Sequence, residues 1–215
     1  MGKPVTEIAK AVIQTEADSI LLLKDRIDQK FDGVCHLLAA CKGKVILIGI
    51  GKSGHIAKKI ASTLSSTGTP SFYMHPGEAG HGDLGVIAGN DVVIMISYSG
   101  ESDEMISLLP GIKRINVPII SMTGNSNSSI GMSSQFHLDV SVKKEACPNN
   151  LAPTSSTTAA LVMGDAIAIS LININNFSSD DFAMSHPSGT LGRRLLTFVS
   201  SIMKTGKDIP IVSLE

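Results

Sequence analysis

Runs of β-branched apolar residues that end in glycine or serine recur along this sequence, each followed by a helical pattern. The clearest runs lie at residues 44–51, 91–100 and 117–124. Continuous apolar runs of this length are typical of strands that are buried on both faces of a parallel sheet. Residues 53–68 show helical spacing instead, with Ile56, Ile60 and Leu64 four residues apart. Strands that alternate with helices predict an α/β fold, in which helices cover both faces of a doubly wound, five-stranded parallel sheet.

Weaker patterns complete the predicted order of elements. They are one long helix or two consecutive helices at 5–41, short strands near 70–76 and at 137–142, and an apolar helix with a Ser/Thr-rich start at 154–175. Residues 101–116 also predict a helix, which Pro110 and Gly111 are expected to bend or interrupt. The whole pattern fits one domain over residues 1–200, because the remaining residues 201–215 are too few to fold alone.

Composition and charge narrow the class of protein. Of the 215 residues, 43% are hydrophobic and 17% are charged, as in a folded globular domain. The formal net charge of −1 indicates no basic surface for nucleic acid or for a membrane. Three cysteines without regular spacing indicate no disulfide framework. The first residues lack the apolar core of a signal peptide, and no apolar run reaches the roughly 20 residues that span a bilayer, so we expect a cytoplasmic protein.

Two strand-to-helix loops are candidates for binding a phosphate. The first, GIGKSG at residues 49–54, contains Gly51, Lys52 and Ser53 and leads directly into a helix. Glycines allow an anion to approach the backbone, and the helix N-terminus favours negative charge. The spacing matches neither the nucleotide-binding P-loop nor a dinucleotide fingerprint. A plain tight turn explains this loop equally well.

The second loop is more informative because it carries three hydroxyls. Ser97, Ser99 and Ser102 surround Gly100 at another strand-to-helix junction. Hydroxyl donors bind a phosphate dianion without a metal or an arginine. Helix capping accounts for one of these serines but not for three. In an open parallel sheet such loops meet outside the carboxyl ends of the strands, so together they indicate a phosphorylated small molecule as ligand.

Four further residues are candidates for acid–base chemistry. Glu104 follows the serine loop by less than one helical turn, and Glu145 lies just past the last predicted strand. His81 and His186 lie in glycine- or proline-rich loops. A carboxylate or an imidazole is suited to moving a proton beside a carbonyl. His, Cys, Asp and Glu do not gather at zinc spacing, so we expect no metal and no cofactor.

Taken together, these motifs resemble the sugar isomerase (SIS) domain of bacterial D-arabinose 5-phosphate isomerases. The resemblance covers about residues 10 to 205 and rests on five motifs in family order: GIGKSG, STGTPSFYMHPGEAGHGDLG, ISYSGESDE, KEACPNNLAPTSSTTAALVMGDAIA and FAMSHPSGTLGRRLL. It implies a three-layer αβα sandwich of flavodoxin-like order that binds no nucleotide. It also implies interconversion of D-ribulose 5-phosphate and D-arabinose 5-phosphate, which supplies the sugar acid Kdo for lipopolysaccharide or capsule.

The resemblance also implies a set of site residues. The catalytic set would be Lys52, His81, Glu104, Glu145 and His186. The substrate-binding set would be Gly51, Ser53, Ser97, Ser99, Ser102, Thr154 and Ser155. In the expected mechanism a glutamate, with Glu104 preferred over Glu145, moves the proton between C2 and C1 through a cis-enediol. His186 would assist ring opening, and either Lys52 or His81 would stabilise the oxyanion.

Two features depart from the family pattern. Family members often have asparagine where this chain has Tyr98, which predicts a differently shaped phosphate pocket. Full-length members commonly continue into a pair of CBS modules, so we interpret residues 201–215 as the start of a truncated CBS module or as an added tail. SIS domains form dimers and tetramers, and the resemblance therefore implies a homo-oligomer, a dimer of dimers with shared active sites. A non-catalytic sugar-phosphate sensor, or an isomerase of another phosphosugar, stays open as an alternative.

Overall fold

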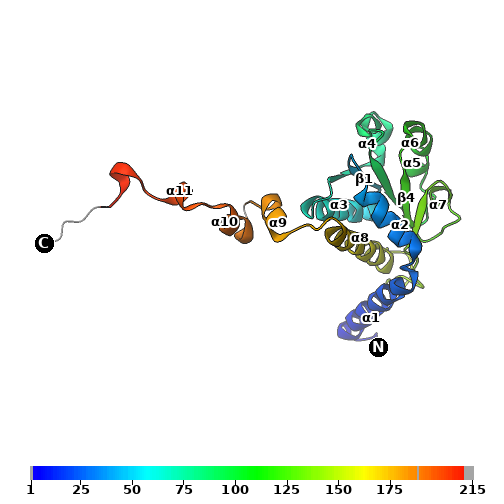
Figure 1. Ribbon diagram of the computed structural model, residues 1–215. Coiled ribbons are helices and arrows are strands. Elements are labelled where there is room, and N and C mark those ends of the chain that lie inside the picture. The colour runs from blue at the N-terminus through cyan, green and yellow to red at the C-terminus, as the bar shows by residue number, and fades with distance from the viewer. Residues whose placement is uncertain (1, 188, 211–215) are drawn as a thin grey trace.

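The computed structural model describes residues 2–187 and 189–210. Within these residues, five parallel strands form one sheet in the order β2-β1-β3-β4-β5 (Figure 1). The strands are β1 (Val45–Gly49), β2 (Ser71–Met74), β3 (Val92–Ile96), β4 (Ile119–Thr123) and β5 (Phe136–Asp139). The strand order reverses between β1 and β3, as in flavodoxin-like sheets. The predicted α/β architecture is therefore confirmed.

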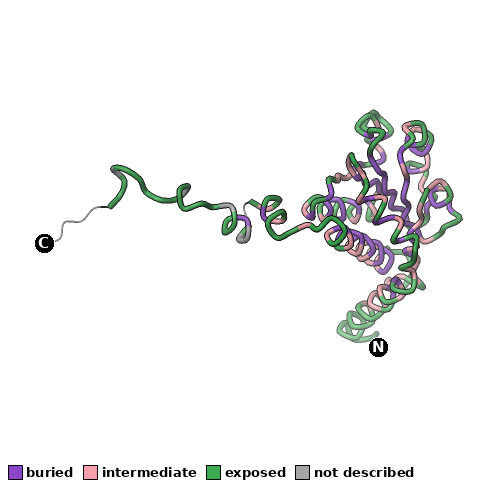
Figure 2. The backbone as a smooth tube through the Cα atoms, in the orientation of Figure 1, coloured by how far each residue is buried: buried purple, intermediate pink, exposed green. Residues whose placement is uncertain are grey.

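Helices cover both faces of the sheet. One face is covered by α2 (Gln29–Ala39), α3 (Gly51–Ser66) and α8 (Ser155–Ile174), and α1 (Val5–Leu23) packs on α8. The other face is covered by α4 (Pro76–Gly80), α5 (Asp103–Ile106), α6 (Leu109–Ile115) and α7 (Ser129–Met132). Alternate side chains of β1 enter the two cores, with Val45 and Leu47 on the first face and Ile46 and Ile48 on the second. Figure 2 shows the buried residues concentrated in the sheet and in the inward sides of these helices.

Short helical turns join or follow these elements. They are η1 (Lys24–Arg26), η2 (Asp83–Val86), α9 (Ser179–Ser185), α10 (Thr190–Leu196), α11 (Val199–Ile202) and η3 (Gly206–Asp208). Residues 5–41 form two consecutive helices, one of the two predicted alternatives, joined through η1. From α9 onward the chain leaves the body of the domain as an extended arm (Figure 1). The interpretation of residues 201–215 as the start of a CBS module or as an added tail stays a prediction, and residues 211–215 lie outside the described residues.

One local prediction is confirmed and another needs correction. The helix predicted at 101–116 is interrupted next to Pro110, as expected: it is broken at Ser107 and Leu108, and Pro110 lies in the first turn of α6. A proline is tolerated there because a first-turn N–H has no partner within its helix. The prediction that no segment is long and apolar enough to span a bilayer is wrong for α8, which meets that criterion by length and mean hydropathy. The contacts that α8 makes with α1, α2 and α3 in the core account for its apolar composition.

Candidate active site

The point where the strand order reverses brings the two predicted phosphate loops together. Ligands of open α/β sheets bind outside the carboxyl ends of the strands at such a point. The loop after β1 enters α3 directly, and Gly51 adopts the left-handed conformation that this turn requires (φ 57°). The loop after β3 contains the three serines. Ser53 and Tyr98, one from each loop, line the same cavity of about 40 Å³ together with Ser156 of α8.

The serine loop is held in shape by its own hydroxyls. The Ser97 and Ser102 Oγ atoms lie 3.1 Å apart, and the Gly100 amide donates to Ser97 Oγ at 3.2 Å. The Glu101 amide donates to Ser99 Oγ at 3.2 Å. Gly100 has a φ of 69°, and a Cβ at this position would lie 2.0 Å from Ser128 Oγ. The sequence therefore folds the hydroxyls into a compact turn, with Ser97 buried and Ser99 exposed.

Glu104 and His81 lie on neighbouring elements at this edge of the sheet. Glu104 is in the first turn of α5, and its side chain is exposed. His81 directly follows the last residue of α4, and it is exposed as well. The two helices α4 and α5 contact each other. An exposed carboxylate therefore follows the serine loop directly, and an exposed imidazole follows the helix that contacts α5. Lys52, in the first turn of α3, is exposed as well.

Glu145 lies in the same region but is engaged by protein groups. Its Oε2 accepts hydrogen bonds from the Thr154 amide at 2.8 Å, from Thr154 Oγ1 at 3.0 Å and from the Ser156 amide at 3.2 Å. Partial burial alone would favour the neutral acid, but the hydrogen bonds from Ser156 and Thr154 outweigh it and lower the pKa of Glu145 below its ordinary value. The carboxylate thus caps the N-terminus of α8 from nine residues upstream in the chain. The motifs gave no sign of this cap.

The two predicted substrate-binding residues at the start of α8 have different surroundings. Thr154 Oγ1 donates to Glu145 and accepts from the Ala146 amide at 2.9 Å. Ser155 is fully buried, and its hydroxyl has no hydrogen-bond partner among the described residues. Direct contact of either hydroxyl with a sugar phosphate stays a prediction.

His186 lies away from the other predicted catalytic residues. It follows α9, its ring stacks on Phe182 with centroids 4.0 Å apart, and its Nδ1 lies 3.0 Å from the Phe182 carbonyl oxygen. Helix α8 runs about 30 Å from the carboxyl edge of the sheet to the amino edge. There Phe177 and Asp181 line a cavity of about 460 Å³ with Val45, the first residue of β1. One chain therefore gathers Lys52, His81, Glu104 and Glu145 at the carboxyl edge, and places His186 beyond the opposite edge.

Among the described residues, no group of three or more His, Cys, Asp or Glu side chains is arranged to hold a metal ion.

Comparison with known proteins adds to this geometry. The chain is 53% identical over 211 residues to arabinose 5-phosphate isomerase KdsD of Escherichia coli K12, an alignment that covers 98% of this chain and 64% of the relative. It is 52% identical over 206 residues to arabinose 5-phosphate isomerase KdsD of Pseudomonas aeruginosa, covering 96% of this chain and 63% of the relative. The chain thus spans somewhat less than two thirds of the length of these curated relatives.

A solved structure and a family model agree with these alignments. A protein of Escherichia coli CFT073, solved in complex with arabinose 5-phosphate, superposes with a TM-score of 0.83 and 42% identity, covering 85% of this chain and 97% of that one. The family model of the SIS domain matches residues 37–170, which include β1 through most of α8 and both phosphate-loop candidates. The chain therefore belongs to the SIS domain family.

Proposed function

We propose that this chain is the isomerase domain of an enzyme that interconverts D-arabinose 5-phosphate and D-ribulose 5-phosphate. One observation carries the proposal: the glycine turn at the start of α3 and the serine loop after β3 meet at the point where the strand order reverses, with Glu104 on the next helix, α5, and His81 at the end of α4, which contacts α5. This supplies phosphate donors and acid–base groups at one edge of the sheet. The similarity to two arabinose 5-phosphate isomerases supports the choice of substrate.

The phosphate would bind in the serine loop. Ser97, Ser99 and Ser102 provide hydroxyl donors, and α3 directs its N-terminus, with Ser53 and Lys52, at the same edge. Hydroxyls and a lysine neutralise a phosphate dianion without a metal ion. The sugar carbons then extend from the phosphate toward α4 and α5.

The chemistry requires a proton to leave C2 of the open-chain aldose and to return to C1. Removal of the C2 proton together with protonation of O1 gives a cis-enediol, and loss of the O2 proton together with protonation of C1 gives the ketose. Glu104 suits the base because its carboxylate is exposed at the edge of the loop. Glu145 suits it less, since its hydrogen bonds hold the carboxylate ionised and lower its basicity. Lys52 or His81 would stabilise negative charge on the enediol oxygen.

A second copy of the chain is proposed to complete the site. The cavity between Ser53 and Tyr98 holds only about 40 Å³, far below the several hundred Å³ that ligand sites occupy. His186 lies on an arm that extends from its own domain, so it is available to the carboxyl edge of a neighbouring subunit (Figure 1). There it would assist opening of the sugar ring. The proposed assembly is a homo-oligomer, a dimer of dimers with shared active sites, located in the cytoplasm and supplying Kdo synthesis.

The test is the conversion of D-arabinose 5-phosphate to D-ribulose 5-phosphate by the purified chain without added metal. Glu104→Gln should lower kcat at least about a hundredfold, since a positioned general base contributes that much. The inhibition constant of inorganic phosphate should stay unchanged. Asp103→Asn is the matched control, because it removes the neighbouring carboxylate of the same helical turn.

Three outcomes would contradict parts of the proposal. Near-normal turnover by the Glu104 variant would exclude that residue as the base. Conversion of only a six- or seven-carbon sugar phosphate would replace the substrate. Saturable binding of arabinose 5-phosphate without any turnover would indicate a sensor domain instead of an enzyme.

A further inference from the structure

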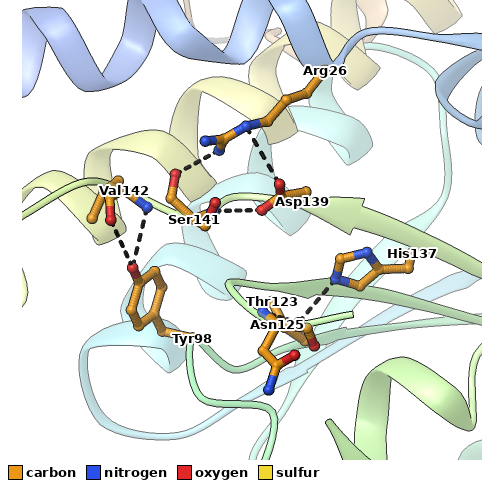
Figure 3. A network of polar contacts seen from close by, with 8 residues as sticks. All are labelled: Arg26, Tyr98, Thr123, Asn125, His137, Asp139, Ser141 and Val142. Carbon is orange, nitrogen blue, oxygen red and sulfur yellow. Dashed lines mark hydrogen bonds and ion pairs between the residues drawn. The ribbon is translucent and has the colours of Figure 1, made fainter. Parts of the chain in front are cut away.

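The side chain of Tyr98 connects two segments of the candidate site. Its hydroxyl accepts a hydrogen bond from the Val142 amide at 3.1 Å and lies 3.5 Å from the Val142 carbonyl oxygen (Figure 3). Tyr98 belongs to the serine loop, whereas Val142 follows β5 and is 44 residues further along the chain. The base of the side chain is fixed, because the Tyr98 carbonyl accepts from the Gly124 amide at 2.8 Å. The ring also lies so close to Gly124 that a Cβ there would approach it to 2.9 Å.

The segment that Tyr98 contacts is held from its other side by Arg26. The guanidinium donates through Nη1 to the Ser141 carbonyl oxygen at 2.5 Å, and its Nε lies 3.4 Å from Asp139 Oδ2. Asp139 Oδ1 in turn accepts from the Ser141 amide at 2.8 Å. Figure 3 shows Arg26 and Tyr98 reaching residues 139–142 from opposite directions. These four residues are therefore fixed at two points, immediately before the chain reaches Glu145.

This anchoring bears on Glu145, which lies three residues after Val142. Glu145 places one carboxylate oxygen between the Thr154 and Ser156 amides. That placement needs a fixed position for residue 142, from which the chain continues to Glu145. The hydroxyl of Tyr98, a residue of the serine loop, fixes residue 142. We propose that Tyr98 is a positioning residue of the site, which sets the distance between the serine loop and the segment that carries Glu145. The catalytic part of this inference rests on the proposed function, whereas the structural part does not.

The structural part is tested by hydrogen exchange of single amides in Tyr98→Phe. This change removes the hydroxyl and keeps the ring against Gly124. Exchange at Val142 should become at least about fivefold faster because its acceptor is lost. Exchange at Thr154 and Ser156 should accelerate as well, since a loosened loop holds Glu145 less tightly. Faster exchange at Val142 alone would overturn the proposal, because the Tyr98–Val142 hydrogen bond would then have no effect on the position of Glu145.

A matched control removes the hydroxyl of Tyr73, the other tyrosine of the chain. That hydroxyl donates to the Gly49 carbonyl oxygen at 2.9 Å, and among the described residues it forms no hydrogen bond with residues 139–142. Exchange at Val142, Thr154 and Ser156 in Tyr73→Phe should match the wild type. Equal acceleration in both variants would overturn the proposal, since general loosening would then explain it. Tyr98→Asn, whose side chain is too short to reach Val142, should reproduce the Tyr98→Phe exchange pattern.

The catalytic part is tested by kinetics with D-arabinose 5-phosphate. Loss of one positioning hydrogen bond should lower kcat about three- to tenfold, with KM within about twofold of the wild type. A rise in KM at unchanged kcat would show that Tyr98 serves binding only, and would overturn the positioning role. If the wild-type chain shows no turnover, the proposed function fails, and the exchange measurements still decide whether Tyr98 positions the Glu145 segment.

Discussion

Replacing Glu145 by glutamine should destabilise this protein more than replacing the other candidate glutamate. The Glu145 carboxylate accepts three hydrogen bonds from Thr154 and Ser156 at the N-terminus of a 20-residue helix. A negative charge there contributes about 0.3–1 kcal/mol, rising to about 2 kcal/mol where the site is partly buried. Glutamine keeps one acceptor oxygen and loses the charge. We therefore expect the free energy of unfolding at pH 7 to fall by about 1–2 kcal/mol.

The pH dependence of this difference follows from the lowered pKa. The folded pKa of Glu145 lies below its ordinary value of 4.5, so the ionised carboxylate stabilises the folded state fully above pH 4.5. That contribution is lost as the pH falls through the depressed folded pKa, where the carboxylate becomes protonated. The gap between wild type and Glu145→Gln should accordingly be constant from pH 6 to 8 and should close in acid.

Urea unfolding followed by circular dichroism at several pH values measures the gap. The matched control is Glu104→Gln, because Glu104 is exposed and its carboxylate forms no hydrogen bond among the described residues. This variant should lose less than about 0.5 kcal/mol, as is usual at exposed positions. In thermal unfolding the Glu145 variant should melt about 2–8 °C lower. Equal stability of the two variants at pH 7, or a gap that persists in acid, would refute the capping role.

Three further predictions concern other parts of the molecule. Gly100→Ala should lower the free energy of unfolding by about 2–4 kcal/mol, because φ is positive and the new Cβ would lie 2.0 Å from Ser128 Oγ. Urea unfolding measures this loss of stability. A loss below about 1 kcal/mol would mean that the loop relaxes around the new side chain. Thr69→Val should raise the free energy of unfolding by about 0.5–1.5 kcal/mol, because the buried Thr69 hydroxyl has no hydrogen-bond partner among the described residues. Lower stability in the same urea unfolding would show that the hydroxyl does form a stabilising hydrogen bond. His186→Ala chains should lack activity alone and regain it when refolded together with Glu104→Gln chains, since one mixed site then has both wild-type groups. Assays that show no recovery would place His186 in its own subunit's site.

The three central strands of the sheet could be predicted because they are continuous apolar runs. Residues 45–49, 92–96 and 119–123 are buried along their whole length, so their composition alone distinguishes them from the amphipathic helices. The helices α4, α7 and α9 were not predicted, because each has only four to seven residues and shows no apolar period.

The site could be predicted only in part, because some of its geometry depends on the tertiary structure. The loops with Lys52 and the three serines follow directly from strand ends, so the fold itself brings them together. The cap that Glu145 forms on α8 depends on how residues 146–153 turn, which no local pattern encodes. The position of His186 depends on where α8 ends and on the direction the chain takes afterwards. Its catalytic role, like those of the other candidates, stays a prediction.

A sugar phosphate is expected to bind at the carboxyl edge of the sheet, between β1 and β3. Amide chemical shifts of the isotope-labelled chain, titrated with D-arabinose 5-phosphate, test it most directly. Saturable shifts should be concentrated in residues 50–54 and 97–102, and inorganic phosphate should affect the same serine loop. Shifts confined to the amino-edge cavity around Thr69 and Phe177, with both loops unchanged, would contradict it.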